Sequence, residues 1–244
     1  MGFKFGQEII DKLRQKKESV CVPKELTEGY IREIYWANVF RDTIQDSPWL
    51  KNKSFSPGRW AVNYIELYVL YRVLNDLKPK NILECGLGQS SKMTIQFAKH
   101  FNSKLSIFEH NKSWIEFFTE SFENVSQYIK YCELENIKVN GKEASTYKDF
   151  KTQIGEEKYD LVFIDGPYGT KNYSRPQALE IVKNLAKSFV VIFDDYERQG
   201  EQNTVREFEE KLKAENIKHI KTTYISDKAL CLICSEDLEF LKTL

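Results

Sequence analysis

A change of hydrophobic pattern near residue 78 constrains the fold of this chain more than any other feature. Beyond it, short apolar runs alternate with amphipathic segments. Strands that alternate with helices indicate a parallel sheet that is covered on both faces. Strands are expected near 81–85, 104–109, 129–133, 159–165, 189–194, 219–225 and 229–234. Helices are expected near 90–100, 112–122, 145–152, 174–187 and 201–215.

The connection between the last two strands sets the direction of one of them. Only Ser226, Asp227 and Lys228 join these strands. Three residues permit a hairpin but not the long crossover that parallel strands need. The expected fold class is therefore α/β, with a seven-stranded, mostly parallel sheet and an antiparallel last strand.

Residues 1–77 differ in pattern from the rest and are expected to form a helical N-terminal extension. A loop rich in Ser and Pro spans 47–59, and an apolar stripe at helical spacing covers 60–77. We expect this loop and helix to act as a lid over a cleft in the second domain, residues 78–244. A homodimer contact is the alternative use of the same surface.

The charge balance of the chain argues against a nucleic-acid partner. The sequence carries 36 basic and 36 acidic residues, so its formal charge is zero. No apolar stretch is long enough for a transmembrane helix, and the first residues lack the apolar core of a signal peptide, so we expect a cytoplasmic protein. Cys231 and Cys234 form a CxxC within an apolar strand, and no second ligand pair for zinc is near, so we expect buried thiols.

A glycine turn follows the first expected strand. Gly86 and Gly88 permit a tight turn and let a ligand approach the backbone. Ser90 and Ser91 can cap the helix that follows. The succession of strand, glycine turn and helix indicates a ligand-binding site at this turn.

An acid ends the second expected strand. Glu109 lies 21 residues beyond Gly88, where a carboxylate can accept hydrogen bonds from both hydroxyls of a ribose. A dinucleotide and S-adenosylmethionine both carry such a ribose. Ser91 stands where the dinucleotide fingerprint has its third glycine, and Glu84 beside the turn disfavours a phosphate. These two residues and the antiparallel last strand favour S-adenosylmethionine.

Two further strands end on acids at the same edge of the expected sheet. Asp165 ends one strand, and Asp194 and Asp195 end the next. Converging carboxylates repel one another and call for a divalent metal, an arginine or a proton. A Mg²⁺ or Mn²⁺ ion held by these three residues and a fork from Arg175 or Arg198 are equal alternatives, and solvated loop acids are the third.

The glycine turn and the acid after the second strand resemble a known family. Glu84-Cys85-Gly86-Leu87-Gly88 resembles motif I of class I S-adenosylmethionine-dependent methyltransferases, whose sheet is Rossmann-like. Glu109 resembles the ribose acid of that family. Glu143, after the third strand, stands where the family contacts adenine. The resemblance covers roughly residues 78–235 as an order of elements.

The strand-end acids resemble two narrower families. Asp165-Gly166 followed by Asp194-Asp195-Tyr196 is similar to metal-dependent sugar O-methyltransferases of macrolide biosynthesis. The wider sequence resembles plant glucuronoxylan methyltransferases, which implies a role in polysaccharide biosynthesis. The matching pieces are Gly86-Leu87-Gly88 with Ser90 or Ser91, the stretch from Phe108-Glu109 to Lys112-Ser113-Trp114, Asp165-Gly166-Pro167 with Ser174-Arg175, and Asp195-Tyr196-Glu197-Arg198. That plant family typically has Ala in place of Gly166 and His in place of Asp194. The two resemblances imply O-methylation of a sugar or glycan hydroxyl.

Methyl transfer to a hydroxyl requires alignment with the sulfonium methyl group and removal of one proton. We expect Asp165 to act as the base or as a metal ligand, supported by Asp194 and Asp195. Arg175 and Arg198 are expected to orient an anionic acceptor.

Aromatic residues near the strand ends are candidates for the remaining contacts. Tyr168, Tyr173 and Tyr196 can stack on a sugar ring, and His110 is expected beside the adenosine. Two other functions are left open by the sequence. One is an NAD-dependent sugar-modifying enzyme, and the other is a methyltransferase-fold binding module without turnover.

Overall fold

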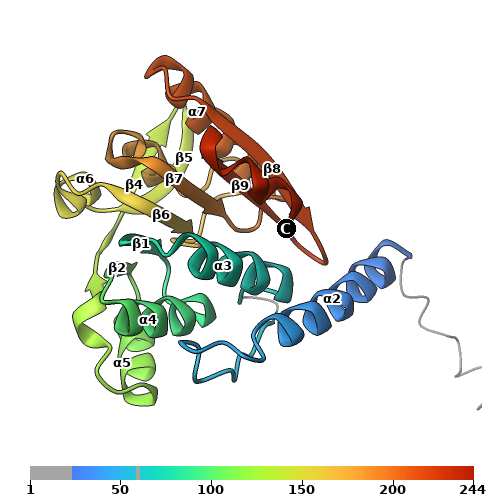
Figure 1. Ribbon diagram of the computed structural model, residues 1–244. Coiled ribbons are helices and arrows are strands. Elements are labelled where there is room, and N and C mark those ends of the chain that lie inside the picture. Colours follow the sequence, from blue (N-terminus) through green and yellow to red (C-terminus); the bar gives the residue numbers. More distant parts are fainter. Residues whose placement is uncertain (1–23, 59–60) are drawn as a thin grey trace, which may run out of the picture.

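The computed structural model describes residues 24–58 and 61–244 (Figure 1). A twisted sheet with helices on both faces forms the body of the molecule, and the helix α2 (Lys24–Thr43) projects from one side of it. Residues 59 and 60, which belong to the expected lid, lie outside the described residues.

The sheet has seven strands in the order β3-β2-β1-β6-β7-β9-β8. The strands are β1 (Asn81–Cys85), β2 (Lys104–Glu109), β3 (Ile129–Tyr131), β6 (Tyr159–Ile164), β7 (Leu185–Phe193), β8 (His219–Ile225) and β9 (Ala229–Ser235). Pairing is parallel from β3 to β7, whereas β9 is antiparallel to both β7 and β8. The expected Rossmann-like fold of class I methyltransferases, with its antiparallel last strand, is confirmed.

Side chains of the central strands are buried on both faces of the sheet. Along β6, Leu161 and Phe163 belong to one apolar cluster, and Val162 and Ile164 belong to the other. All four side chains are fully buried. Successive strand residues point to opposite faces, so a continuous apolar run is what a strand covered on both sides requires.

Different helices cover the two faces. The first cluster contains apolar side chains of α3 (Tyr64–Leu77), α4 (Gln89–Phe101) and α5 (Lys112–Ser121). The second contains apolar side chains of α6 (Phe150–Ile154) and α7 (Gln199–Ala214). In the part of the chain that the structure describes, no helix combines the length and apolar character that crossing a bilayer requires.

Helix α3 begins four residues later than the apolar stripe suggests. Asn63 caps it, because its side chain accepts a hydrogen bond from Glu66 N at 3.1 Å and its own N–H donates to Glu66 Oε2 at 2.8 Å. This reciprocal capping box fixes the first turn. Helix α2 is tied to the same end: Glu33 accepts hydrogen bonds from Tyr64 N and from Ser226 Oγ, both at 2.6 Å.

A hairpin that the sequence analysis did not expect follows β3. Strands β4 (Leu134–Val139) and β5 (Lys142–Tyr147) pair antiparallel in a separate two-stranded sheet. Asn140 and Gly141 form its turn with φ angles of 51° and 77°. Asn-Gly is the residue pair that such two-residue turns favour. The helix expected at 145–152 is therefore wrong, and only α6 remains of it.

The helix expected at 174–187 is also wrong. This segment forms two short 3₁₀ turns, η2 (Pro176–Glu180) and η3 (Val182–Asn184), and then enters β7. Arg175 has a left-handed φ of 53°, which keeps it out of a helix, and Pro176 follows it. The remaining short helices are η1 (Ser126–Tyr128) and η4 (Glu236–Thr243).

Candidate functional site

A cavity of about 350 Å³ lies where the carboxyl ends of β1, β2 and β6 meet. In open α/β sheets, ligands bind at this edge. Its walls come from the turn after β1 (residues 86–89), the end of β2 (Glu109 and His110), Trp114 of α5, Tyr147 of β5, the loop after β6 (residues 165–168) and residues 61–62. The glycine turn and Glu109, which the sequence analysis proposed as one site, thus line one cavity.

The two glycines of the turn have different roles. Gly86 has a φ of 101°, a conformation that side chains disfavour, and its N–H donates to Phe108 O at 2.9 Å. A Cβ placed on Gly88 would meet nothing within 4 Å, so this glycine borders open space in the cavity. Gly86 therefore shapes the turn, whereas Gly88 leaves room for a ligand.

Glu109 is held in place by backbone amides. Oε1 accepts hydrogen bonds from the N–H groups of His110 and Asn111, both at 2.8 Å, and Oε2 accepts one from Leu87 N at 3.0 Å. Burial opposes ionisation, but the hydrogen bonds from His110, Leu87 and Asn111 outweigh it and lower the pKa of Glu109. Oε2 accepts only this one bond among the described residues, so it can accept another from a ribose hydroxyl.

Aromatic rings border the cavity near Glu109. Trp114 Nε1 donates to Leu87 O at 2.6 Å and so fixes the indole beside the glycine turn. The rings of His110 and Tyr168 make an edge contact with centroids 5.3 Å apart. Tyr168 is two-thirds exposed. These rings offer flat apolar surface on which a base or a sugar can stack.

Glu84, Ser90 and Ser91 lie beneath the cavity and do not line it. Glu84 is fully buried and accepts hydrogen bonds from Ser90 Oγ at 2.6 Å, Ser91 Oγ at 2.8 Å and Thr94 Oγ1 at 2.7 Å. Burial raises the pKa of Glu84, and the three hydroxyls partly offset that effect. The group joins the end of β1 to the first turns of α4.

Glu143 lies outside the cavity. It is exposed on β5 opposite Lys138, and its carbonyl oxygen accepts a hydrogen bond from Thr170 Oγ1 at 2.9 Å. The residue of β5 that lines the cavity is Tyr147, whose hydroxyl donates to Phe108 O at 3.0 Å. Tyr147 was not predicted from the sequence, because a helix was expected in this segment.

The strand-end acids do converge, as expected. Single carboxylate oxygens of Asp165, Asp194 and Asp195 lie within 4.8 Å of one another. Arg175 is buried among them: NH2 donates to Asp195 Oδ2 at 2.8 Å and to Asp165 Oδ1 at 3.3 Å, and NH1 donates to Asp194 O at 2.9 Å. Of the two alternatives for charge compensation, the arginine fork is present. Because its guanidinium is engaged here, Arg175 is not free to orient an acceptor.

Two further charged residues that were not predicted from the sequence also lie in this acid cluster. Lys228 Nζ lies 3.4 Å from Asp195 Oδ1 and 3.8 Å from Asp194 Oδ2. Glu66, the capping residue of α3, is buried against Asp194. Burial and then the neighbouring Asp194 carboxylate raise the pKa of Glu66 well above its ordinary value. The Asn-x-x-Glu pattern before the apolar stripe signals the cap, but nothing in the sequence signals the contact with Asp194.

The three aspartates differ in their access to the cavity. Only Asp165 lines it, with a side chain 19% exposed, whereas Asp194 and Asp195 are buried behind it. Burial, followed by repulsion from Asp194, raises the pKa of Asp165 well above its ordinary value. Burial opposes ionisation of Asp194, but a hydrogen bond from Glu66 and the charge of Lys228 outweigh it and lower its pKa.

The remaining candidates lie at or behind the rim. Arg198 is about half exposed, and its NH1 lies 2.7 Å from Asp195 Oδ2. Tyr173 is buried, with its hydroxyl donating to Glu207 Oε2 at 2.8 Å, so it is not available for stacking on a ligand. Tyr196 is partly buried against the second apolar cluster. Tyr168 is thus the exposed one of the three tyrosines.

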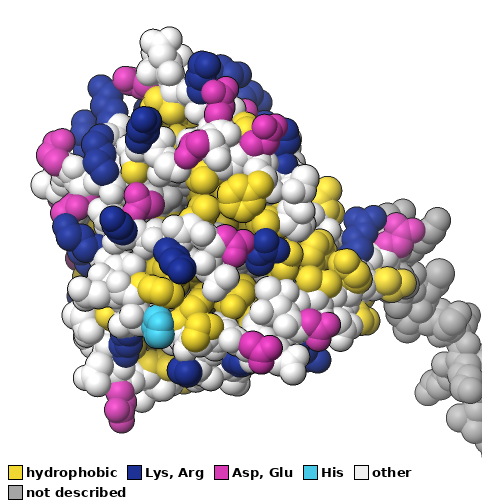
Figure 2. Space-filling view, viewed as in Figure 1, with side chains coloured by type: hydrophobic (Ala, Val, Ile, Leu, Met, Phe, Trp, Pro, Cys, Tyr) yellow, Lys and Arg dark blue, Asp and Glu magenta, His cyan; other side chains and the backbone are white. Residues whose placement is uncertain are grey.

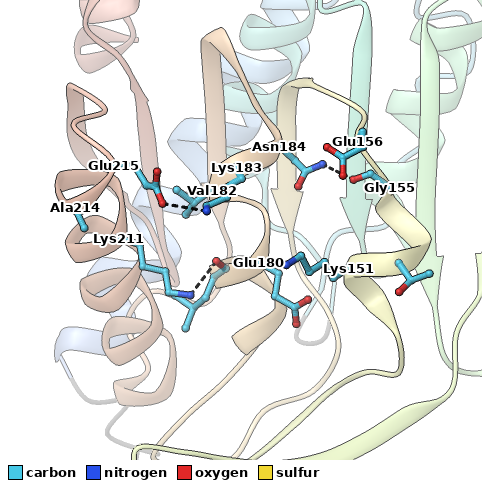
Figure 3. A pocket seen from close by; sticks show the side chains of 12 residues that line it. Lys151, Gly155, Glu156, Glu180, Val182, Lys183, Asn184, Lys211, Ala214 and Glu215 are labelled. Carbon is cyan, nitrogen blue, oxygen red and sulfur yellow. Dashed lines mark hydrogen bonds and ion pairs between the residues drawn. The ribbon is translucent and has the colours of Figure 1, made fainter.

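A larger hollow of about 720 Å³ lies at the opposite edge of the sheet (Figure 3). Its walls include Gly155 and Asn184, just before the amino ends of β6 and β7. Its charges are mixed and partly paired, as in the 3.6 Å contact of Lys183 Nζ with Glu215 Oε1. This hollow holds none of the strand-end acids and none of the glycine turn, so we place the site at the carboxyl edge.

The face of the molecule seen in Figure 2 is not dominated by charge of one sign. Figure 2 shows basic and acidic side chains interspersed over the body, and apolar side chains along the arm formed by α2. Those exposed apolar residues are Tyr30, Ile31, Ile34 and Tyr35. The visible face thus fits the zero formal charge of the chain.

Several solved structures with a similar fold are described as methyltransferases. One is a methyltransferase of Podospora anserina bound to S-adenosylhomocysteine, with 17% identity and a TM-score of 0.49 over 94% of this chain and 96% of that one. A methyltransferase of Geobacter sulfurreducens has 13% identity and a TM-score of 0.49 over 93% and 96%. One of Pyrococcus furiosus has 15% identity and a TM-score of 0.45 over 83% and 97%.

The sequence itself matches no protein-family model and no curated protein. Likeness at such low identity concerns the fold alone. Any assignment of chemistry to this chain therefore depends on its own cavity and acid cluster.

Proposed function

We propose that this chain is an S-adenosylmethionine-dependent methyltransferase that acts on a hydroxyl group. The observation that carries the proposal is that Glu109 and Gly88 line one cavity, at the edge where such sheets bind ligands. Glu109 supplies a fixed carboxylate for the ribose hydroxyls, and Gly88 leaves open space beside the backbone. The ring of His110 also lines the cavity and offers a surface for the adenine.

The glycine turn favours this cofactor over a dinucleotide. A pyrophosphate binds to free N–H groups at a helix N-terminus. Here the N–H of Gly88 already donates to Ser91 Oγ at 2.9 Å, and the Glu84 carboxylate lies directly beneath. A ligand without phosphate, with a cationic amino group and a sulfonium, suits this turn better. The NAD-dependent alternative is therefore the weaker one.

The proposed chemistry is an in-line displacement at the sulfonium methyl group. The acceptor oxygen forms a bond to the methyl carbon, the carbon–sulfur bond breaks, and its electron pair stays on sulfur. The hydroxyl proton passes to a base, for which Asp165 is the candidate because it alone of the three aspartates lines the cavity. Asp194 and Asp195 would hold the cations that position it.

The proposed acceptor is a sugar or glycan hydroxyl. Tyr168 presents an exposed ring at the cavity, and Arg198 presents a half-exposed guanidinium near Asp195. A ring for stacking and a cation for a carboxylate are what an acidic sugar requires. We assign the catalytic domain to residues 78–244. We also propose that the N-terminal extension acts as a lid, because Ala61 and Val62 line the cavity.

Calorimetric titration of the purified chain with S-adenosylhomocysteine tests the cofactor, with NAD as the competing ligand. We expect micromolar binding of S-adenosylhomocysteine alone. Glu109→Ala should weaken it about 10- to 100-fold, because a hydrogen bond to a charged group is lost. Glu143→Ala is the matched control: it removes an exposed carboxylate outside the cavity and should leave the affinity unchanged.

Other outcomes of this titration have defined meanings. Binding of NAD, or of neither ligand, would overturn the proposal and leave the fold without a function. Binding of S-adenosylhomocysteine without methyl transfer to any of a panel of sugars and glycans would favour a binding module. Loss of affinity in Glu143→Ala equal to that in Glu109→Ala would move the adenosine site toward β5.

A further inference from the structure

Lys228 places a buried ammonium beside the strand-end acids. It lies in the turn between β8 and β9, and its side chain is 11% exposed. Nζ lies 3.4 Å from Asp195 Oδ1 and 3.8 Å from Asp194 Oδ2, and it donates to Ala61 O at 3.0 Å. Lys228 thus joins the acid cluster to the segment that lines the cavity.

The position of Lys228 is fixed by its own turn. Its N–H donates to Asp227 Oδ1 at 3.0 Å, and Ser226 N donates to Lys228 O at 2.7 Å. Asn63, the cap of α3, donates to the same Asp227 oxygen at 2.9 Å. The backbone that carries the ammonium is therefore clamped against the N-terminal end of α3. The Lys228 ammonium is therefore held at the site, unlike the ammonium of a mobile surface lysine.

Each carboxylate oxygen of Asp194 and Asp195 either binds a donor or faces the Lys228 ammonium, although Asp195 Oδ1 accepts no hydrogen bond among the described residues. Oδ2 of Asp195 binds both Arg175 and Arg198, and its Oδ1 faces Lys228. Oδ1 of Asp194 accepts Asp195 N at 2.6 Å, and its Oδ2 faces Lys228. Mg²⁺ and Mn²⁺ require several oxygen ligands at about 2 Å in an octahedral arrangement. With the Lys228 ammonium in place, Asp194 and Asp195 therefore do not fit a divalent ion.

We propose that the Lys228 ammonium takes the place of a divalent metal ion at this site and makes the chain independent of metal. The inference deepens the proposed methyltransferase function and rests on it for the identity of the reaction. Lys228 is a positioning residue: its ammonium lies against Asp194 and Asp195 behind Asp165, and it holds Ala61 at the cavity. A divalent ion would have to enter beside a fixed positive charge and take over its oxygens.

Titration of the full chain with Mn²⁺ tests the inference directly. Wild type should show no saturable binding below the millimolar range. Lys228→Met removes the charge and should bind Mn²⁺ at least about tenfold more tightly than wild type, because one like charge less than 4 Å from the ligand oxygens is gone. Adding Asp165→Asn to Lys228→Met should abolish the gain.

Two variants serve as matched controls. Lys228→Arg keeps the charge and should not gain Mn²⁺ binding. Lys221→Met removes a lysine of the same hairpin that pairs with Glu209 outside the acid cluster, and it should match wild type. If Lys228→Met fails to fold, Lys228→Gln and the wild-type titration itself still decide the question.

Saturable micromolar binding of Mn²⁺ to wild type, lost in Asp165→Asn, would overturn the inference. So would equal Mn²⁺ affinity in wild type and a folded Lys228→Met. Titration of the same preparations with S-adenosylhomocysteine keeps the two proposals apart. Failure of wild type to bind S-adenosylhomocysteine would contradict the proposed methyltransferase function, whereas the Mn²⁺ result tests only the role of Lys228.

Discussion

Gly86 and Gly166 are in direct backbone contact: a Cβ added to Gly166 would lie 2.8 Å from the Cα of Gly86. The same Cβ would lie 2.9 Å from the hydroxyl of Tyr147. The ends of β1 and β6 thus approach one another more closely than any side chain allows. This contact gives a reason for glycine at a position where the resembled plant family typically has alanine.

We predict that Gly166→Ala destabilises the protein by about 1–3 kcal/mol, because overpacking forces the two loops apart. Gly88→Ala provides the contrast. Its backbone is extended and a Cβ there meets nothing within 4 Å, so stability should not change. The same methyl group would occupy the cavity, and affinity for S-adenosylhomocysteine should fall. Chemical denaturation and calorimetry of both variants check this. Equal stability loss in the two would contradict the assignment of open space at Gly88.

Asp165 should control the acidic limb of the pH–rate profile. Burial and the neighbouring Asp194 raise its pKa, and a base must be deprotonated to accept a proton. The rate of methyl transfer should therefore rise with pH, with a midpoint above the roughly 4 of an ordinary aspartate. Asp165→Asn should lower kcat about 10²- to 10⁴-fold and leave the affinity for S-adenosylhomocysteine nearly unchanged. A profile that is flat from pH 5 to pH 9 would exclude Asp165 as the base.

The strands and their direction were predictable because each rule involved is local. Strands β6, β7 and β9 of the large sheet carry apolar runs, and the three residues between β8 and β9 allow only a hairpin. The β4–β5 hairpin was missed although Asn140-Gly141 signals it, because β4 lacks an apolar run that would mark it as a strand. The helix expected at residues 174–187 was wrong for a different reason. The apolar residues of this segment recur at helical spacing in the sequence, but the segment folds into two separate 3₁₀ turns.

The functional site likewise has one part that the sequence predicts and another part that it does not. The convergence of Asp165 with Asp194 and Asp195 follows from parallel strand direction alone. The contacts of Glu66 and Lys228 do not, because they depend on how the N-terminal extension and a distant turn pack over the sheet. The sequence likewise does not tell whether a metal ion or an arginine neutralises the strand-end acids, because such acids bind either. Only the packing of the folded chain places Arg175 among them.

Glu66 should make stability depend on pH. Its pKa is raised in the folded state, first by burial and then by Asp194, so the folded form binds a proton that the unfolded chain has lost. Stability from this group is complete below its unfolded pKa and falls as the pH rises toward the folded pKa. Glu66→Gln keeps the shape without titrating. Between pH 5 and pH 8, the free energy of unfolding of Glu66→Gln should fall less than that of wild type. The difference should be about 1.4 kcal/mol for each unit by which the pKa of Glu66 is raised within this range.

Thermal or urea unfolding at the two pH values measures this difference. The exposed Glu210→Gln is the control and should follow wild type. A constant offset between Glu66→Gln and wild type at both pH values would mean that Glu66 is ionised in the folded protein.

The thiols of Cys231 and Cys234 should be unreactive in the folded chain. Both are fully buried on β9, and burial raises the pKa of Cys231 to about 12 and that of Cys234 to about 11. Only the thiolate reacts with alkylating agents. Iodoacetamide should modify these two residues at a rate set by unfolding, which peptide mapping by mass spectrometry measures. Fast labelling of either in native protein, or its protection by Zn²⁺, would contradict a purely packed role.

Arg175 and Arg198 contact the same carboxylate oxygen, Asp195 Oδ2, and should nevertheless behave differently when changed. Arg175 is buried, and its planar group serves two carboxylates and two backbone carbonyls at once. Lysine cannot reproduce that fork. Arg175→Lys should therefore leave buried acceptors unpaired and destabilise the protein by about 3–5 kcal/mol. Any loss of acceptor binding in Arg175→Lys would then result from this loss of stability.

Arg198→Ala removes a half-exposed partner and should change stability by less than about 1 kcal/mol. If Arg198 binds the carboxylate of an acidic sugar, the variant should raise KM for that sugar and not for its neutral counterpart, with kcat retained. Thermal unfolding and steady-state kinetics with matched acidic and neutral acceptors separate the two arginines. A KM effect of equal size on both acceptors would show that Arg198 acts through Asp195 and does not contact the substrate's charge.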